Sequence, residues 1–165
     1  PQGVISMNHA AETIFRRKNP IRRESMKDPS VYEGKPILIT RNYHDLELYN
    51  GDMGMIWSTS SRTGKREWNG FFSGVEGASR RVPLHRIPSY ESAFAVTVHK
   101  SQGSEFEEIL LILPDQDLPL LTRELFYTAV TRGKQRVVIC GNEMVIRAMV
   151  ERRIRRNSGL RDLLW

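Results

Sequence analysis

Apolar residues near the start of the chain recur every three or four positions, as on one face of an α-helix. The pattern predicts an amphipathic helix over residues 6–18, with Ser6 as its N-cap. Asn19-Pro20 follows and predicts the end of the helix, because proline cannot continue it. Residues 20–33 are polar and basic without a period, which predicts a long loop. The apolar positions of the helix are Met7, Ala10, Ala11, Ile14 and Phe15.

Three short apolar runs predict buried strands. They occupy residues 36–40, 109–113 and 137–140, and continuous runs of this kind are typical of parallel strands covered on both faces. Helical patterns follow the second and third runs, so strands and helices alternate along the chain. This order predicts an α/β fold with a parallel sheet and helices on both of its faces.

The two helices after these strands have recognisable caps. Thr122 is placed to cap a helix that begins at Arg123-Glu124 and ends at Gly133 as its C-cap, and Asn142 is placed to cap a final helix. The side chains expected to face inward are Leu125, Phe126, Ala129 and Val130 in the first helix, and Met144, Val145, Ala148 and Met149 in the second.

Residues 51–88 follow a different pattern, in which glycines separate short runs that contain aromatic residues. This pattern predicts a small antiparallel β insertion that starts at the turn signal Asn50-Gly51. The expected organisation is one domain over residues 1–50 and 89–165, interrupted by a β subdomain over residues 51–88. The aromatic residues fit a small core, and the alternative is that one ring is exposed and stacks on a nucleic-acid base.

The net charge of +6 and the pI near 9.8 favour a polyanionic partner, because Lys and Arg release condensed counterions when they neutralise phosphates. Much of the excess charge lies in two clusters, and most of their side chains are individually expected to belong to a solvated face or a tail rather than to bind a partner. The clusters are Arg16, Arg17, Lys18, Arg22, Arg23 and Lys27 near the start, and Arg152, Arg153, Arg155 and Arg156 near the end.

The only cysteine, Cys140, excludes an internal disulfide and a cysteine-rich zinc site. At the end of an apolar strand it is expected to be an inert buried thiol, and a reducing, cytoplasmic setting fits. No apolar run approaches the roughly 20 residues that a membrane span needs, and no membrane partner is expected. The start lacks the pattern of a secretory signal and an initiator Met, so we expect the chain to be a fragment.

Several kinds of catalytic site are absent from the sequence. The Gly-Lys pairs at residues 34–35, 64–65 and 133–134 lack the spacing of a phosphate loop. No paired-histidine or cysteine metal spacing and no serine-hydrolase elbow occurs. The chain is therefore expected to have no ATP-binding cradle and no metal ligands of its own.

Residues 93–106 contain the densest cluster of candidate chemistry. The stretch begins as an apolar run of strand length and changes at Thr97 to small, polar and ionisable residues that lead to Gly103, which can adopt positive φ. It predicts a strand followed by a helical turn, and ligands bind beyond the carboxyl ends of strands in α/β sheets. A binding site and a hydrated surface turn fit this pattern equally well. The same rule places Arg41 and Asn42, which follow the run at 36–40, on the ligand side, although an exposed salt bridge is an equally good expectation for Arg41.

Two ordered stretches resemble motifs of superfamily 1 DNA helicases. Residues 97–106 (Thr-Val-His-Lys-Ser-Gln-Gly-Ser-Glu-Phe) are similar to motif V, and residues 124–132 (Glu-Leu-Phe-Tyr-Thr-Ala-Val-Thr-Arg) are similar to motif VI. Within that superfamily the chain most resembles the RecD family, the alpha subunits of exodeoxyribonuclease V, from residue 1 to near residue 165. The resemblance implies a RecA-like second motor domain with an inserted SH3-like barrel. Supporting stretches lie at residues 34–42, 50–54 and 158–160.

The resemblance to motif VI makes Arg132 the candidate catalytic residue. It implies an arginine finger, whose rigid fork neutralises the charge that phosphoryl transfer spreads over the γ-phosphate. Without the resemblance, Arg132 would read as an ordinary cation near a helix C-terminus.

The resemblance to motif V implies contacts with nucleotide and with DNA. Glu105 is expected to contact nucleotide, and Gln102 and Gly103 to relay nucleotide state through the turn, so these three join Arg132 as candidate cofactor-binding residues. His99 is expected to contact the DNA strand or to act in interdomain coupling. The candidate DNA-binding set is Thr97, His99, Lys100, Ser101, Arg41 and Asn42.

As a whole, the resemblance implies an ATP-dependent DNA helicase that moves 5′ to 3′ on single-stranded DNA in double-strand-break repair and recombination. ATP and Mg²⁺ would be bound mainly by a first motor domain outside this chain, so the isolated chain is expected to be inactive. The implied partners are single-stranded DNA and the beta and gamma subunits of exodeoxyribonuclease V. Two rivals are a non-enzymatic single-stranded-DNA-binding module and a scaffold whose basic tail docks a partner subunit.

Overall fold

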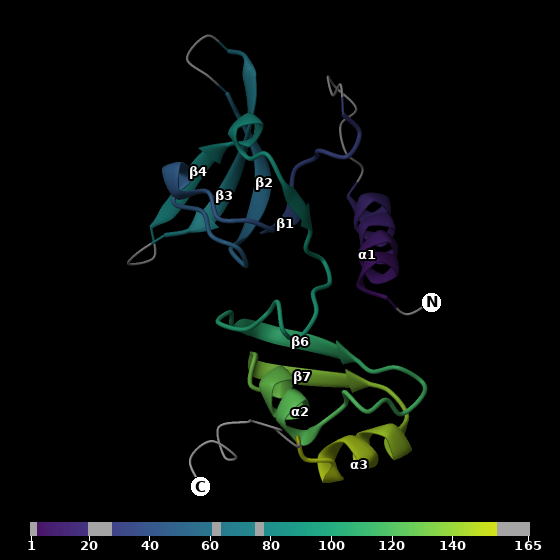
Figure 1. The fold of residues 1–165 in the computed structure, drawn as a ribbon. Coiled ribbons are helices and arrows are strands. Elements are labelled where there is room, and N and C mark those ends of the chain that lie inside the picture. Colours follow the sequence, from purple (N-terminus) through teal and green to yellow (C-terminus); the bar gives the residue numbers. More distant parts are fainter. Residues whose placement is uncertain (1–2, 20–27, 61–63, 75–77, 155–165) are drawn as a thin grey trace, which may run out of the picture. The chain divides into compact units, whose positions relative to one another are not determined.

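The computed structural model describes residues 3–19, 28–60, 64–74 and 78–154 (Figure 1). The chain divides into two compact units, Pro1–Thr97 and Val98–Trp165. The first contains an antiparallel sheet and the second a parallel strand pair with two helices. The predicted mixed α/β class is thus confirmed. Sequence features that lie outside the described residues are Pro20 and residues 20–27 of the expected loop, which include Arg22, Arg23 and Lys27, and Arg155, Arg156 and the stretch 158–160.

The sheet of the first unit has the strand order β4-β3-β2-β1-β5, and all its neighbouring strands are antiparallel. The strands are β1 (Lys35–Ile39), β2 (Met53–Ser60), β3 (Arg66–Ser73), β4 (Ser79–Pro83) and β5 (Tyr90–Ser92), with 3-10 turns η1 (His44–Leu46) and η3 (Leu84–Arg86) between them. The core of this unit consists of Val31, Ile37, Ile39, Leu48, Ile56, Phe72, Val82, Leu84 and Ile87.

Two glycines of the glycine-rich pattern make room for one ring of this core. A Cβ atom on Gly54 would lie 2.5 Å from the ring of Phe72, and one on Gly70 would lie 2.8 Å from the same ring. No real Cβ tolerates such a distance, so the ring of Phe72 occupies space that only glycine leaves free. The predicted short antiparallel strands are present, and these glycines are packing positions within them.

The prediction that residues 36–40 form a strand of a parallel sheet is wrong. β1 pairs antiparallel with β2 on one side and with β5 on the other. Ile37 enters the core and Leu38, on the opposite face, is buried as well, so a central antiparallel strand covered on both faces carries the same continuous apolar run. The antiparallel sheet therefore includes strands outside residues 51–88. The domain boundaries at 50 and 89 stay a prediction.

The predicted N-terminal helix is present as α1 (Val4–Lys18). Its N-cap is Gly3 rather than Ser6, and the amide of Met7 donates to the carbonyl of Gly3 at 3.1 Å. Apolar periodicity indicates the apolar face of a helix but not its first residue, which explains the wrong cap. No residue of α1 is buried, and Ile14 on the predicted apolar face is 57% exposed. The helix ends at Asn19 as predicted, and Phe15 packs its ring 5.4 Å from that of Phe94, between centroids.

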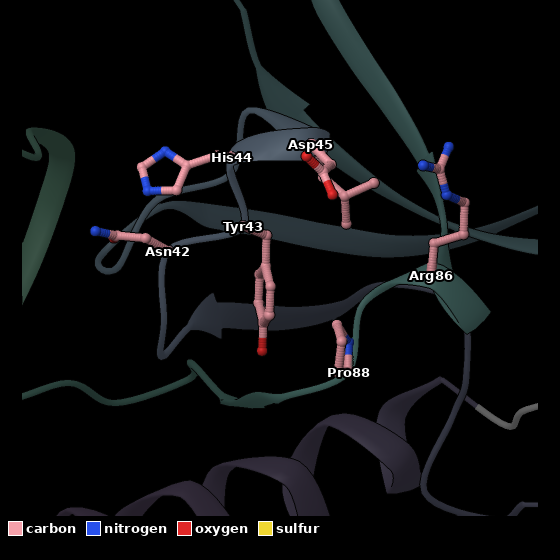
Figure 2. A pocket seen from close by; sticks show the side chains of 7 residues that line it. Asn42, Tyr43, His44, Asp45, Arg86 and Pro88 are labelled. Atoms are coloured by element: carbon pink, nitrogen blue, oxygen red, sulfur yellow. The ribbon is translucent and has the colours of Figure 1, made fainter.

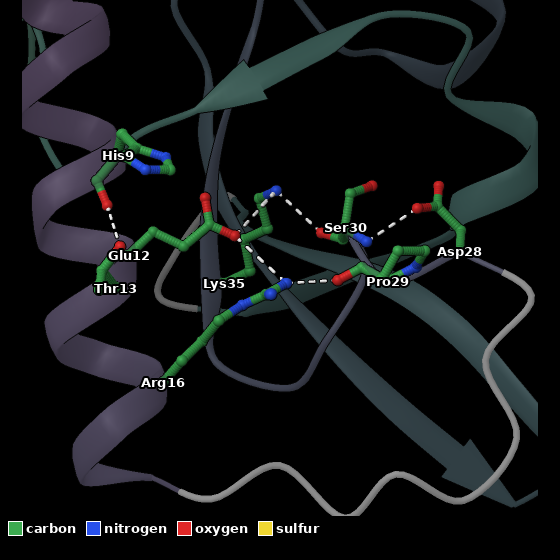
Figure 3. A network of polar contacts seen from close by, with 8 residues as sticks. All are labelled: His9, Glu12, Thr13, Arg16, Asp28, Pro29, Ser30 and Lys35. Atoms are coloured by element: carbon green, nitrogen blue, oxygen red, sulfur yellow. Dashed lines mark hydrogen bonds and ion pairs between the residues drawn. The ribbon is translucent and has the colours of Figure 1, made fainter.

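Polar contacts fasten α1 to the segment before β1 (Figure 3). The carboxylate of Glu12 lies 3.4 Å from Nη2 of Arg16 and 3.8 Å from Nζ of Lys35. Lys35 also donates to the carbonyl of Ser30 at 2.8 Å, and Arg16 donates to that of Pro29. The buried ammonium of Lys35 is thereby paired, as a buried charge requires.

The second unit contains the parallel strands β6 (Phe106–Ile112) and β7 (Gly133–Cys140) and the helices α2 (Arg123–Val130) and α3 (Glu143–Glu151). Both predicted N-caps are confirmed: Thr122 Oγ1 accepts from the amide of Leu125 at 3.3 Å, and Asn142 Oδ1 accepts from that of Met144 at 2.9 Å. The core of this unit is Leu113, Leu121, Val145 and Met149, against which Leu111, Leu125, Phe126 and Ile146 pack.

Several burial predictions in this unit are wrong. Leu110 is 60% exposed and Met144 is 72% exposed, although both were expected to face inward. Cys140 is exposed, not a buried thiol. Leu110, Ile112, Val138 and Cys140 share one face of the β6–β7 pair by register, and that face is open in the described part of the chain. Gly133 is not the C-cap of α2, since Thr131 takes that position and Gly133 begins β7.

Candidate nucleotide and DNA site

The polar stretch after Thr97 forms a tight turn, as the sequence predicts. The hydroxyl of Ser101 donates to the carbonyl of Val98 at 2.8 Å, and the amide of Ser104 donates to the carbonyl of Ser101 at 3.1 Å. Gly103 has φ +85°, with open space where a side chain would be. The expectation that this glycine adopts positive φ is therefore confirmed.

The predicted strand before this turn is not formed. β5 ends at Ser92, and residues 93–96 are irregular. The side chain of Asn8 on α1 takes the place of a neighbouring strand, because its Nδ2 donates to the carbonyl of Ala95 at 2.7 Å and its Oδ1 accepts from the amide of Ala95 at 3.0 Å. Asn8 was missed by the sequence reasoning, and nothing in the sequence marks this pairing across 87 residues.

Arg132 connects the two motif-like stretches. Its Nη1 donates to the carbonyl of Ser104 at 3.1 Å and its Nε to the carbonyl of Thr128 at 3.2 Å, while Nη2 lies 3.3 Å from Thr131 Oγ1. The backbone amide of Phe106 also donates to the carbonyl of Arg132 at 2.8 Å. The half-buried guanidinium is thus held between the end of α2 and the turn that precedes β6.

Glu105 forms an ion pair with Lys134, 3.2 Å between Oε2 and Nζ. Both side chains are more than half exposed, so solvent screens the pair and its contribution to stability is small. Lys134 was missed by the sequence reasoning. The parallel register, in which Phe106 is opposite Gly133, brings the two residues together, and a sequence pattern does not specify register between strands this far apart.

The remaining motif V candidates differ in exposure. Thr97, His99, Lys100 and Gln102 are exposed. Ser101 is buried, and its hydroxyl already donates a hydrogen bond within the turn. This suits a structural role better than donation of a hydrogen bond to a DNA phosphate. The roles of these residues stay predictions.

Arg41 and Asn42 lie in the first unit, after β1. Asn42 Oδ1 accepts from the amide of Asn50 at 2.8 Å, and Asn42 lines a pocket of about 460 Å³. Figure 2 shows the other labelled lining residues, Tyr43, His44, Asp45, Arg86 and Pro88. Because β1 is antiparallel, the rule for the ends of parallel strands does not apply here, and the DNA contacts of Arg41 and Asn42 stay a prediction.

Two further observations bear on the expected ligands. Trp57 is 47% exposed while Trp68 packs against the core, so one tryptophan ring of the sheet does face solvent. Across residues 3–19, 28–60, 64–74 and 78–154, no group of three or more His, Cys, Asp and Glu side chains is arranged to hold a metal ion. Within the same ranges, no helix has the length and apolar character to cross a membrane.

Comparison with known proteins places the chain in a class. Residues 92–140, which include the turn, Arg132 and Lys134, match the family described as the UvrD-like helicase C-terminal domain. The RecD subunit of the RecBCD enzyme from Mycolicibacterium smegmatis is 45% identical over 135 residues, which are 82% of this chain and 23% of that protein. Two further RecD subunits match 98% of the chain at 40% and 44% identity. The chain belongs to the RecD family.

More distant matches were found as well. The ATP-dependent RecD2 DNA helicase of Deinococcus radiodurans is 26% identical over 97% of this chain and 21% of that protein. A solved structure of Pif1 helicase from Bacteroides, in complex with ADP-AlF3 and single-stranded DNA, is 18% identical, with a TM-score of 0.47 over 94% of this chain and 42% of that one. That likeness is too weak to carry an argument. The chain spans about a quarter of the length of the RecD relatives.

Proposed function

We propose that this chain is the part of a RecD-type, ATP-dependent DNA helicase that delivers an arginine finger to ATP bound elsewhere in the protein. The observation that carries the proposal is the placement of Arg132, whose guanidinium is held by the carbonyls of Thr128 and Ser104. These contacts hold the guanidinium of Arg132, which belongs to the motif VI-like stretch, beside the turn of the motif V-like stretch. An arginine supplied from outside the phosphate loop stabilises the charge of phosphoryl transfer.

The residues present fit part of a nucleotide site. Arg132 and Lys134 supply cations beside the turn, and Glu105 supplies a carboxylate suited to a ribose hydroxyl. The chain has no phosphate loop, and its described part has no cluster of carboxylates that would hold Mg²⁺. ATP and Mg²⁺ would therefore be bound mainly by other parts of the protein, and Arg132 would act on the γ-phosphate from the side.

The DNA strand would lie against the exposed part of the turn. Thr97, His99 and Lys100 are exposed donors there, whereas the buried Ser101 would shape the turn. As the nucleotide site closes on Arg132, the carbonyl of Ser104 would move together with the Arg132 guanidinium. The contacts between the turn and the DNA would change as a result. Repeated cycles would give translocation on single-stranded DNA, in the 5′ to 3′ direction, within a complex with the beta and gamma subunits during double-strand-break repair in the cytoplasm.

The proposal is tested by Arg132→Ala and Arg132→Lys in the full-length protein. We expect DNA-stimulated ATPase activity to fall by about 10³-fold or more in both variants, because lysine lacks the fork, while affinity for a single-stranded oligonucleotide is retained. Arg136→Lys is the matched control, since this nearby exposed arginine pairs with Glu108 on the neighbouring strand. Unchanged ATPase activity in the Arg132 variants would contradict the proposal and favour a non-enzymatic DNA-binding module.

A further inference from the structure

Arg152, the residue after α3, makes a dense set of contacts with the segment that precedes α2. Its Nη1 donates to Asp117 Oδ1 at 2.8 Å, and its Nη2 donates to Asp117 Oδ2. Nη1 also donates to the carbonyls of Leu118 at 2.8 Å and Leu121 at 2.9 Å. A planar guanidinium can serve a carboxylate and two carbonyls in one geometry, which a lysine ammonium cannot reproduce.

Two backbone contacts extend this attachment to the first turn of α2. The amide of Arg123 donates to the carbonyl of Arg152 at 2.8 Å, and the amide of Ile154 donates to Glu124 Oε2 at 3.1 Å. The amide of Arg123 is one of the first four of the helix, which have no partner inside it. Together with the Thr122 cap, these contacts fix the first turn of α2 to the segment after α3.

The charges at this attachment favour its formation. The hydrogen bond from Arg152 lowers the pKa of the Asp117 carboxyl below its ordinary value, and the same contact raises the pKa of Arg152. The pKa of Glu124 is lowered as well, by its own backbone amide first and by that of Ile154. All three groups are therefore charged at neutral pH, and the attachment is intact there.

The other end of α2 leads to Arg132. Nε of Arg132 donates to the carbonyl of Thr128 in the last turn of this eight-residue helix. A short helix moves as one body, so a tilt at its first turn displaces the guanidinium at its last. Arg147 offers a contrast, because it pairs with Glu143 four residues earlier within α3 itself.

We propose that Arg152 is a positioning residue for Arg132: by fixing the first turn of α2, it sets the direction in which the Arg132 guanidinium points. This inference rests on the proposed function. In this proposal Arg152 acts through α2 and is not assigned a contact with the nucleotide.

The experiment uses the full-length protein with ATP and a single-stranded oligonucleotide. Arg152→Met should lower the kcat of the DNA-stimulated ATPase by about 10- to 100-fold, the effect of misplacing a reacting group by about 1 Å. KM for ATP and the Kd for the oligonucleotide should stay within twofold. Arg152→Lys should recover only part of kcat. Arg147→Met, the control, should leave kcat unchanged.

A double-variant cycle separates positioning from general stabilisation. If Arg152 acts through Arg132, Arg152→Met should cause no further loss of kcat in the Arg132→Lys background, since coupled residues are not additive. Independent losses in the double variant would overturn the inference, as would a normal kcat for Arg152→Met. If Arg132→Lys itself leaves kcat unchanged, the proposed function fails first, so the two failures are distinguishable.

Discussion

The two units of the chain bury their apolar strands to different extents. In the antiparallel sheet, Ile37, Ile39 and Ile56 have no exposed surface. In the parallel pair, Leu110 and Val138 lie side by side in register and are 60% and 46% exposed. The antiparallel unit closes its core with its own strands and the loops between them. In the parallel pair, Leu111 on one face packs against the core formed with α2 and α3, while the other face is open in the described part of the chain. A continuous apolar run therefore predicts a strand that is covered on both faces, but the unit that contains the strand does not always cover both.

The largest expected effect comes from removing side chains at the two extremes of this comparison. Ile56→Ala should lower the free energy of unfolding of the 165-residue chain by about 2–5 kcal/mol, because it leaves a cavity in a closed core. Leu110→Ala should cost less than about 1 kcal/mol, since its side chain is mostly in water. Urea unfolding monitored by circular dichroism measures both. Equal losses would mean that the open face is covered in solution.

The next effect concerns the glycines under Phe72. Gly54→Ala should destabilise the first unit by about 1–3 kcal/mol, since the added methyl would meet the Phe72 ring at 2.5 Å and the carbonyl of Phe71 at 2.8 Å. Gly3→Ala is the comparison, because its Cβ would meet nothing within 4 Å and its expected cost is limited to a weaker N-cap of α1. Thermal unfolding of both variants measures the difference. A neutral Gly54→Ala would show that the ring is free to move aside.

A smaller effect is expected at the helix caps of the second unit. Asn142→Ala should lower its stability by about 1 kcal/mol, because the amide of Met144 loses its acceptor. Asn142→Asp should be nearly neutral, since aspartate keeps that acceptor. Amide hydrogen exchange at the start of α3 measures the effect locally, and unchanged protection in Asn142→Ala would contradict the cap.

The smallest effect is a pH dependence. The pKa of Asp117 is lowered in the folded chain, so its contribution to stability is complete above the unfolded pKa of about 3.9 and is lost as pH falls through the lower folded value. Asp117→Asn should therefore reduce the difference in stability between pH 5 and pH 2. Acid titration followed by fluorescence measures this. If the variant lost as much stability between pH 5 and pH 2 as the original chain, Asp117 would be excluded as a contributor to this pH dependence.

Much of the candidate site was predictable, because it depends on local signals. Gly103 adopts positive φ in a polar turn, and Thr122 and Asn142 cap their helices as predicted. These features depend on residues within a few positions of one another. Arg132 was singled out by resemblance, but its contact with Ser104 required the parallel pairing of β6 and β7.

The sequence by itself determined the local elements: most helix and strand positions, the N-caps of α2 and α3, the glycine turn and the mixed α/β class. The tertiary structure alone decided that β1 is antiparallel and that Asn8 forms hydrogen bonds with the backbone of Ala95. It also decided that Glu105 pairs with Lys134 and that Arg152 fixes the start of α2. Local signals arise from backbone geometry and capping within one or two turns. Partners 15 to 87 residues apart are selected only when the core closes and fixes the register, because many side chains of the same type compete for each contact until then.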